Sequence, residues 1–401
     1  MSGSTFGWLA YDASEKQRAL EVVESLKQPG TVDELGIGVI RDTLARVMFP
    51  GASVLHTRAR YFTFIPALIS IAAREESVEK ASSKLHDLEV SLIFALLKGD
   101  PTAEGLIGRE AKRNLKRMPS AAHWAALRRY GLVTAQKRSI DQVLRAAVGA
   151  GRRAAATVQN PGDDHDASRP VYGLDATAAH GWLPDHWRRD GATFTMKSAE
   201  AEYLRERIMT STAGSLYEWF LINRVAPAGF RYVWDHDDVA RFPARMRLIM
   251  RHAKCFHHLI QGAAILYNLY VSRMVEDDEL VAAYENQFED WDRDIRDFQV
   301  LADWSIDEFI TAIRQLNPRL GPVTANFVKQ WDGLVRQPPQ STRANSMEEL
   351  VRRREWDTKK ARARLFNPAA RSDWRGNAGL IPLDYNWSVA ARIVNDIQEA
   401  L

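Results

Sequence analysis

The most constraining feature of this 401-residue chain is the spacing of its apolar residues, which recur at intervals of three and four between glycine- and proline-containing breaks. Such spacing places the apolar side chains on one face of an α-helix. It predicts long helices over 58–74, 78–97, 252–274 and 279–302, with shorter ones between them. A short strand is favoured only at 231–234. We therefore predict a mainly α, multi-helix fold with two or three subdomains and little β.

Turn-rich stretches predict how the chain is divided. A length of 401 residues favours two or three domains. The polar segment 151–170 contains Asn160-Pro161-Gly162 and is typical of a linker, as is the sequence after Pro338-Pro339. The predicted order is an N-terminal helical domain with basic helices (1–150), a linker (151–170), a helical domain with a long acidic helix (171–337) and a C-terminal helical extension (338–401).

Composition favours a cytoplasmic protein without a membrane partner. Cys255 is the single cysteine, so an internal disulfide is impossible, as is usual in a reducing cytosol. Residues 1–9 lack the basic and then apolar pattern of a secretory signal. The most apolar stretches, 61–73 and 88–97, are shorter than the roughly 20 residues that a membrane span requires.

The net charge of +3 conceals two strongly charged segments. Residues 105–153 contain twelve basic and two acidic residues, a net charge of +10. Residues 276–308 contain thirteen acidic and two basic residues, a net charge of −11. Such segregation of charge bears on which partners a protein attracts.

The basic segment is predicted to form short helices over 106–117, 121–130 and 140–148. Its cations recur at spacings of one and three, which would give one basic stripe on a helix. Cations held on one rigid face suit binding to a phosphate backbone, with DNA favoured. A solvated face, or docking onto the acidic helix, is the alternative. The candidate nucleic-acid-binding residues are Arg109, Lys112, Arg113, Lys116, Arg117, Arg128, Arg129, Lys137 and Arg138.

The acidic helix has a narrow apolar seam. Its members alternate spacings of four and three, as in a helix-packing face with a charged exterior. Packing within the chain is the favoured interpretation, and docking of a protein partner is the alternative. The candidate partner-binding residues are Phe288, Trp291, Ile295 and Phe298.

No catalytic residue can be identified from the sequence. The chain has no phosphate-binding P-loop, no dinucleotide-binding glycine motif and no nucleophile elbow. His252, Cys255, His257 and His258 could ligate zinc, but an apolar core helix is the better interpretation. Two carboxylate-rich turns, 163–166 and 235–238, could hold a metal ion, although solvated turns are favoured. We predict no cofactor and no metal site.

Two arginines, Arg58 and Arg60, precede an apolar helix, where the helix dipole does not favour cations. Ion pairs with Asp33, Glu34 or Asp42 would make them structural, which is the favoured interpretation. An anion-binding site is the alternative.

Two blocks of sequence resemble an uncharacterised bacterial family, a domain of unknown function. The first runs from Gly30 to Gly38 and continues through Phe49-Pro50-Gly51 to Thr57–Phe62. The second is Asn114-Leu115-Lys116-Arg117 followed by Arg128-Arg129-Tyr130-Gly131. The resemblance implies a gene beside those of helicases and phospholipase D-like proteins in bacterial phage-defence islands.

These observations predict a non-enzymatic accessory subunit of an anti-phage defence system. It would bind nucleic-acid backbone and protein partners, such as a helicase or a phospholipase D-like subunit. One alternative is a metal-dependent nuclease or phosphodiesterase that uses the 235–238 region. Another is a structural scaffold whose charged faces bind partner subunits.

Overall fold

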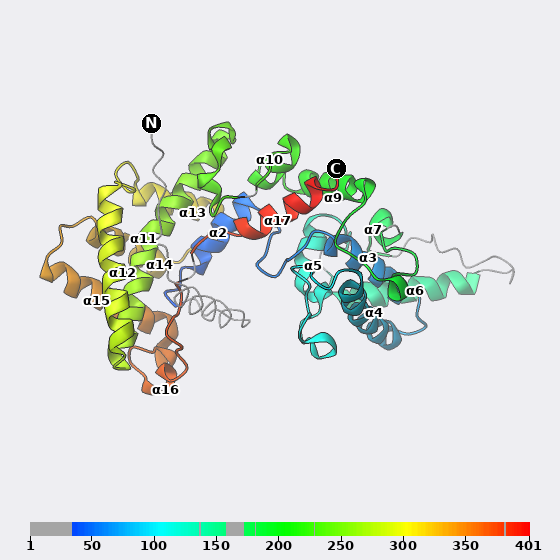
Figure 1. Cartoon of the computed structure of the whole chain (residues 1–401), viewed down its shortest axis with the longest axis horizontal. Coiled ribbons are helices and arrows are strands. Elements are labelled where there is room, and N and C mark those ends of the chain that lie inside the picture. The colour runs from blue at the N-terminus through cyan, green and yellow to red at the C-terminus, as the bar shows by residue number, and fades with distance from the viewer. Residues whose placement is uncertain (1–33, 136–137, 158–171, 181, 228, 381) are drawn as a thin grey trace. The chain divides into compact units, whose positions relative to one another are not determined.

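The computed structural model describes residues 34–135, 138–157, 172–180, 182–227, 229–380 and 382–401. These residues form sixteen α-helices and four short 3-10 helices (Figure 1). Within them there is no β-strand, only an isolated bridge between Val133 and Leu174. The predicted mainly α, multi-helix fold with little β is confirmed. No helix in the described part of the chain is long and apolar enough to cross a membrane.

The chain forms two compact units, and neither is continuous in sequence. Unit 1 comprises residues 1–43 and 252–383, and unit 2 comprises residues 44–251 and 384–401. The division falls inside two helices, α2 (Gly38–Met48) and α11 (Ala244–Met274). Each of these helices therefore contributes residues to both units.

The four consecutive domain ranges predicted from the sequence, 1–150, 151–170, 171–337 and 338–401, stay predictions. One local expectation is wrong, because the predicted linker begins inside a helix. Helix α6 (Ile140–Thr157) continues through Gly151 to Thr157. The alanine-rich sequence after Arg153 favours helix and extends it. The remainder of that linker, 158–170, lies outside the described residues.

Unit 2 is built around α3 (Tyr61–Ala72), in which eleven of twelve residues are buried. A helix that is apolar all round has to be a core helix, because no face of it suits water. Helix α3 packs against α4, α5, α7 and α9. The other helices of this unit are α4 (Val78–Gly99), η1 (Lys112–Asn114), α5 (Pro119–Arg129), α6, α7 (Ala176–His180), α8 (Trp187–Asp190), α9 (Ser198–Ser211), α10 (Leu216–Asn223), η2 (Val233–Asp235), η3 (Asp237–Arg241) and α17 (Trp387–Gln398).

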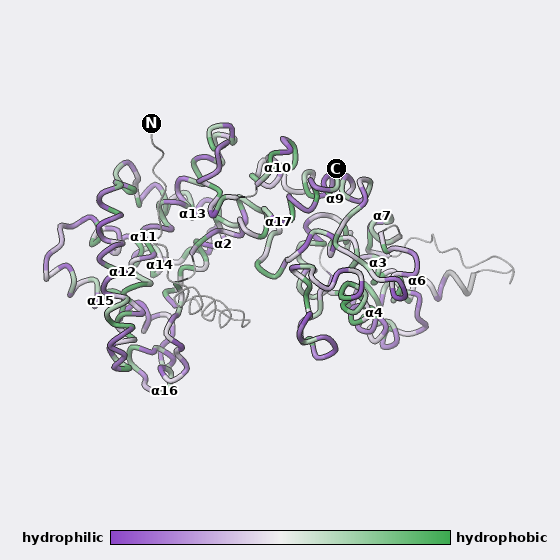
Figure 2. The backbone as a smooth tube through the Cα atoms, in the orientation of Figure 1, coloured by the Kyte–Doolittle hydropathy of each residue, from purple (hydrophilic) through white to green (hydrophobic). Residues whose placement is uncertain are grey.

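Unit 1 contains the acidic helix α12 (Asp278–Asp297), along which hydrophilic and hydrophobic residues alternate (Figure 2). The side chain of Asp277 accepts a hydrogen bond from the backbone N–H of Leu280 at 3.0 Å and so caps the helix. The other elements of this unit are α13 (Ile306–Leu316), α14 (Pro322–Val335), α15 (Ser341–Lys359), η4 (Lys360–Arg362) and α16 (Pro368–Arg371).

A cluster of buried charges lies inside unit 1. Glu355, which is fully buried, accepts hydrogen bonds from the Tyr267 hydroxyl at 2.9 Å and from Lys359 Nζ at 3.0 Å. Lys359 also pairs with Glu34, which in turn pairs with Arg364 at 2.8 Å. Buried charges are tolerated only when they are paired and hydrogen-bonded. The cluster therefore fixes Glu34 and the end of α15 to the long helix α11.

Close packing of α12 on α11 gives a testable consequence at Gly262. A Cβ atom there would lie 2.4 Å from the ring of Trp291. We expect Gly262→Ala to lower the free energy of unfolding by about 1–3 kcal/mol, because the helices must separate. The measurement is urea denaturation.

The control for that substitution is Gly333→Ala in α14, where nothing lies within 4 Å of the added Cβ. The control should be neutral or should stabilise by up to about 1 kcal/mol, since alanine favours helix over glycine. Equal effects of the two substitutions would contradict the close contact between Gly262 and Trp291.

The helix predicted over 106–117 is wrong. Apart from the three-residue η1, this segment consists of turns. The backbone has positive φ at Gly105 (77°), Gly108 (84°) and Lys112 (48°), which a right-handed helix cannot accommodate. The regular spacing of its cations therefore does not produce a stripe on a helix.

Two other predicted elements differ from the structure. The strand expected at 231–234 is wrong, because η2 (Val233–Asp235) lies there, with Val233 and Trp234 buried. The acidic helix ends at Asp297 rather than at residue 302. Gln299 has a φ of 46°, so the chain turns directly after the helix.

Candidate nucleic-acid interface

The first part of the basic segment is a loop anchored on the core of unit 2. The Tyr61 hydroxyl accepts a hydrogen bond from the backbone N–H of Ile107 at 2.9 Å. Gly108 is pressed against α4, since a Cβ there would lie 2.7 Å from the side chain of Ile93. These contacts hold the loop, and the cations that follow it, against buried helices.

Arg109, a predicted nucleic-acid contact, instead forms hydrogen bonds within this loop. Its guanidinium donates hydrogen bonds to the carbonyl oxygen of Pro101, at 2.5 Å, and to that of Ala103. A guanidinium that satisfies backbone carbonyls closes the loop on itself. Arg109 therefore shapes the segment that presents the other cations.

Six predicted cations are exposed on unit 2, and we call them the exposed cation set. None of the six forms an ion pair with a carboxylate among the described residues. Arg128 is half-buried, and Lys137 lies outside the described residues. The set comprises Lys112, Arg113, Lys116, Arg117, Arg129 and Arg138.

Two other arginines of unit 2, one half-buried and one buried, are neutralised by carboxylates. Arg58 pairs with Asp396 at 2.8 Å, and the buried Arg60 pairs with the buried Glu200 at 3.1 Å. The structural interpretation of Arg58 and Arg60 is thus confirmed, although the expected partners were wrong. Because no residue of the exposed cation set is paired in this way among the described residues, these six charges are available to an anionic ligand.

Helix α5, which carries Arg129, is seated on the core by a carboxylate. Glu89 is buried and accepts hydrogen bonds from the backbone N–H of Ser120, at 2.7 Å, and from its hydroxyl, at 3.1 Å. Burial raises the pKa of Glu89 to about 7, against these hydrogen bonds, which lower it. An acceptor at the start of a helix satisfies N–H groups that have no partner within the helix.

Two buried histidines pack beside the same helix. His56 and His123 stack with ring centroids 4.6 Å apart. Burial lowers the pKa of His56 to about 3, with His123 as a second cause, and lowers the pKa of His123 to about 4. Both rings are therefore neutral at pH 7 and act as packing groups.

This histidine pair predicts a pH dependence of stability. Below pH 6.5 both histidines are protonated in the unfolded chain but not in the folded one, which favours unfolding. Glu89 has the opposite effect, because its raised pKa keeps its carboxyl group protonated in the folded state. One net proton remains from these three groups, and His258, whose pKa burial also lowers to about 4, adds a second. Between about pH 6 and pH 5 the free energy of unfolding should therefore fall by about 2.7 kcal/mol per pH unit.

Substitution of one histidine tests this account. His123→Phe should reduce this dependence by about 1.4 kcal/mol per pH unit between about pH 6 and pH 5, because one histidine fewer is protonated on unfolding. Urea denaturation at several pH values gives the slope. A variant with the slope of the wild type would show that His123 does not titrate in this way.

Two members of the predicted partner-binding set lie inside unit 1. Trp291 and Ile295 are buried, and Trp291 Nε1 donates a hydrogen bond to the carbonyl of His258 at 2.8 Å. Phe288 is half-buried against Trp291, with ring centroids 5.2 Å apart, and Phe298 is half-exposed. Packing within the chain therefore accounts for most of the seam, and partner binding by Phe288 and Phe298 stays a prediction.

The candidate metal ligands are not gathered into a site. Within the described residues no three His, Cys, Asp or Glu side chains group as metal ligands would. On α11, His252 Nδ1 accepts a hydrogen bond from Trp304 at 2.9 Å, and His257 Nδ1 accepts one from the backbone of Leu383 at 3.2 Å. Asp238 pairs with Arg241 at 2.8 Å. The turn at 163–166 lies outside the described residues.

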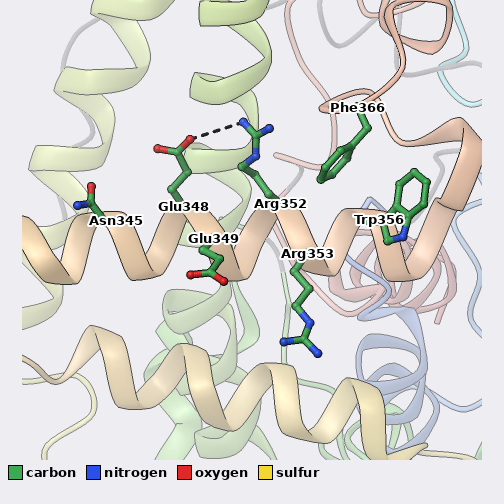
Figure 3. Close-up of a pocket in the computed structure, with 7 residues that line it drawn as sticks. All are labelled: Asn345, Glu348, Glu349, Arg352, Arg353, Trp356 and Phe366. Atoms are coloured by element: carbon green, nitrogen blue, oxygen red, sulfur yellow. Dashed lines mark ion pairs between the residues drawn. The ribbon is translucent and has the colours of Figure 1, made fainter.

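A pocket on α15 was not predicted from the sequence. It has a volume of about 610 Å³ and is open to solvent (Figure 3). Two exposed rings, Trp356 and Phe366, meet edge to face with centroids 5.2 Å apart, and Arg352 lies over Phe366 at 5.3 Å. Two glutamates and two arginines line the pocket, so the charge of its lining favours neither an anionic nor a cationic ligand.

Comparison with known proteins gives one match. A model described as a family of unknown function (DUF6361) matches residues 3–401. Searches of curated proteins and of solved structures gave no match. The family therefore covers nearly the whole chain and supplies no residue roles.

Proposed function

This chain belongs to the DUF6361 family, whose function is unknown, and we propose that it binds the phosphate backbone of nucleic acid through the exposed cation set. The observation that carries the proposal is that six exposed cations of one segment form no ion pair with a described carboxylate. Protein surfaces that bind a backbone need several cations presented by a rigid element. The contacts of the loop with Tyr61 and α4 supply that rigidity.

The proposed role is that of a non-enzymatic accessory subunit in the cytoplasm. The resemblance to a family encoded beside helicases and phospholipase D-like proteins supports a place in an anti-phage defence system. A helicase would supply the motor activity and the present chain a contact with DNA. Co-purification of the chain with a helicase encoded beside it, from a cell that expresses both, tests this part of the proposal, and separate elution of the two proteins would count against it.

Direct binding tests the central part of the proposal. Fluorescence anisotropy with a labelled DNA of about 20 nucleotides, at low salt, should give saturable binding that weakens as salt rises. Binding that is absent at low salt would overturn the proposal. The same DNA incubated with the protein and Mg²⁺ or Mn²⁺ should remain uncut, and cleavage would favour the nuclease alternative.

A scaffold is the other alternative, in which the cations bind an acidic protein surface. The sequence of α12 shows that such surfaces exist, since it carries many carboxylates. Competition separates the two functions. Excess poly-glutamate should displace the labelled DNA poorly, because its carboxylates do not reproduce the spacing and geometry of the phosphates of a nucleic-acid backbone. Equal affinity for the two polymers would favour the scaffold.

A further inference from the structure

Two residues of the exposed cation set lie beside exposed aromatic rings, and binding of a phosphate backbone gives these rings no role. Phe94 on α4 is 40% exposed, and Tyr172 is 50% exposed. Arg113 lies over the Phe94 ring at 5.7 Å from its centroid, and Arg138 lies over the Tyr172 ring at 5.1 Å. Both arginines belong to the exposed cation set, so two of its six members are paired with an accessible ring.

The backbone that follows Tyr172 is fixed by hydrogen bonds to residues 134–135. The backbone N–H of Thr134 donates to the carbonyl of Gly173 at 2.9 Å, next to the bridge between Val133 and Leu174. A φ of 85° at Gly173 lets the chain turn directly after Tyr172. The ring therefore has a defined place on the surface of unit 2.

The backbone of Arg138 is held by a third aromatic residue. Trp124 Nε1 donates a hydrogen bond to the carbonyl of Arg138 at 2.9 Å, and Trp124 is itself half-buried on α5. The tryptophan fixes the backbone of Arg138, and Arg138 covers one part of the Tyr172 ring. Trp124, Arg138 and Tyr172 thus form one aromatic and cationic cluster.

Exposed rings beside arginines suit one form of nucleic acid. In a duplex the faces of the bases are stacked on one another and are hidden from a protein, whereas a single strand exposes them. Aromatic rings and guanidinium planes bind such bases by stacking, and neighbouring cations bind the backbone. From this arrangement we infer that the ligand of unit 2 is single-stranded nucleic acid, with bases stacked at Tyr172 and at Phe94. The inference rests on the proposed binding by the exposed cation set.

An abasic strand separates stacking from charge. The wild-type chain is titrated against three labelled probes of about 20 nucleotides: an oligothymidine, an abasic strand with the same number of phosphates, and a duplex. We expect the oligothymidine to bind at least about 10-fold tighter than the abasic strand, since stacking strengthens binding several-fold or more per base. Equal affinities would overturn the inference and leave backbone binding in place.

Failure of the two proposals can be told apart. If none of the three probes binds at low salt, the proposed function falls and the inference falls with it. If the duplex binds as tightly as the oligothymidine, backbone binding stands and the preference for single strands is wrong. If poly-glutamate competes as well as unlabelled oligothymidine, the surface binds an acidic protein instead.

Ring removal identifies the residues. The double variant Phe94→Leu and Tyr172→Leu should lower the affinity for oligothymidine at least about 10-fold and leave the affinity for the abasic strand unchanged. Phe366→Leu, which removes a similarly exposed ring outside the basic segment, is the matched control and should change neither affinity. Circular dichroism checks that both variants keep their helices. An unchanged preference in the double variant would contradict the assignment to these rings.

Discussion

Replacement of Lys112, Arg113, Lys116 and Arg117 by glutamate is expected to lower the affinity for nucleic acid by at least about 100-fold at low salt. The four side chains are exposed and form no ion pair with a carboxylate of the described chain. Their reversal should therefore leave the fold intact while it replaces attraction of phosphates by repulsion. Anisotropy titration with a labelled strand measures the loss.

A variant with the same change in net charge controls for long-range electrostatics. Four exposed arginines of unit 1 serve this purpose, and their reversal to glutamate should lower the affinity far less than the first variant does. They are Arg314, Arg319, Arg362 and Arg375. If both variants lose affinity equally, binding depends on the net charge of the protein and the exposed cation set has no special role.

The largest expected effect on stability is at Glu355. Its carboxylate accepts hydrogen bonds from Tyr267, Lys359 and the backbone N–H groups of Arg364 and Leu365, the last two at 2.8 and 2.9 Å. Glu355→Ala removes all four interactions and leaves buried donors without an acceptor. We expect the free energy of unfolding to fall by about 3–5 kcal/mol.

Glu349→Ala is the matched control, because it makes the same chemical change on the same helix at an exposed position. Its effect should stay within about 0.5 kcal/mol. Urea denaturation of the two variants gives the comparison. A loss below about 1 kcal/mol at Glu355 would show that the buried charges contribute little to the fold.

The helices were predictable where a buried stripe and a terminal signal coincide. Helix α4 follows Ser77, whose hydroxyl accepts a hydrogen bond from Lys80 N–H at 3.1 Å, and the apolar pattern continues from there. The apolar seam of the acidic helix was also predictable from its spacing, and Trp291 and Ile295 are buried, as packing within the chain requires. In these segments local preference and tertiary packing favour the same conformation.

The basic segment shows why spacing alone can mislead. Cations at intervals of one and three fit a helix, but exposed side chains place no constraint on the backbone. Gly105 and Gly108 were the available signal, and their positive φ values break the expected helix. The hydrogen bonds of Arg109 to carbonyl groups of its own loop have no sequence signature.

Partners far apart in the chain could not be paired from one sequence. Arg58 binds Asp396 and Arg60 binds Glu200, whereas Asp33, Glu34 or Asp42 were the expected partners. The same holds for the rings of the candidate site. Tyr172 lies beside Arg138 because the chain returns along residues 133–135, and no local pattern encodes that return.

The salt dependence of binding tests the central claim most directly. For the wild-type chain with a labelled strand, the logarithm of the association constant should fall linearly with the logarithm of salt concentration, with a slope of about −4 if five phosphates are contacted. The variant with four reversed cations should show a slope close to zero. A wild-type affinity that does not change with salt would contradict binding of the phosphate backbone by the exposed cation set.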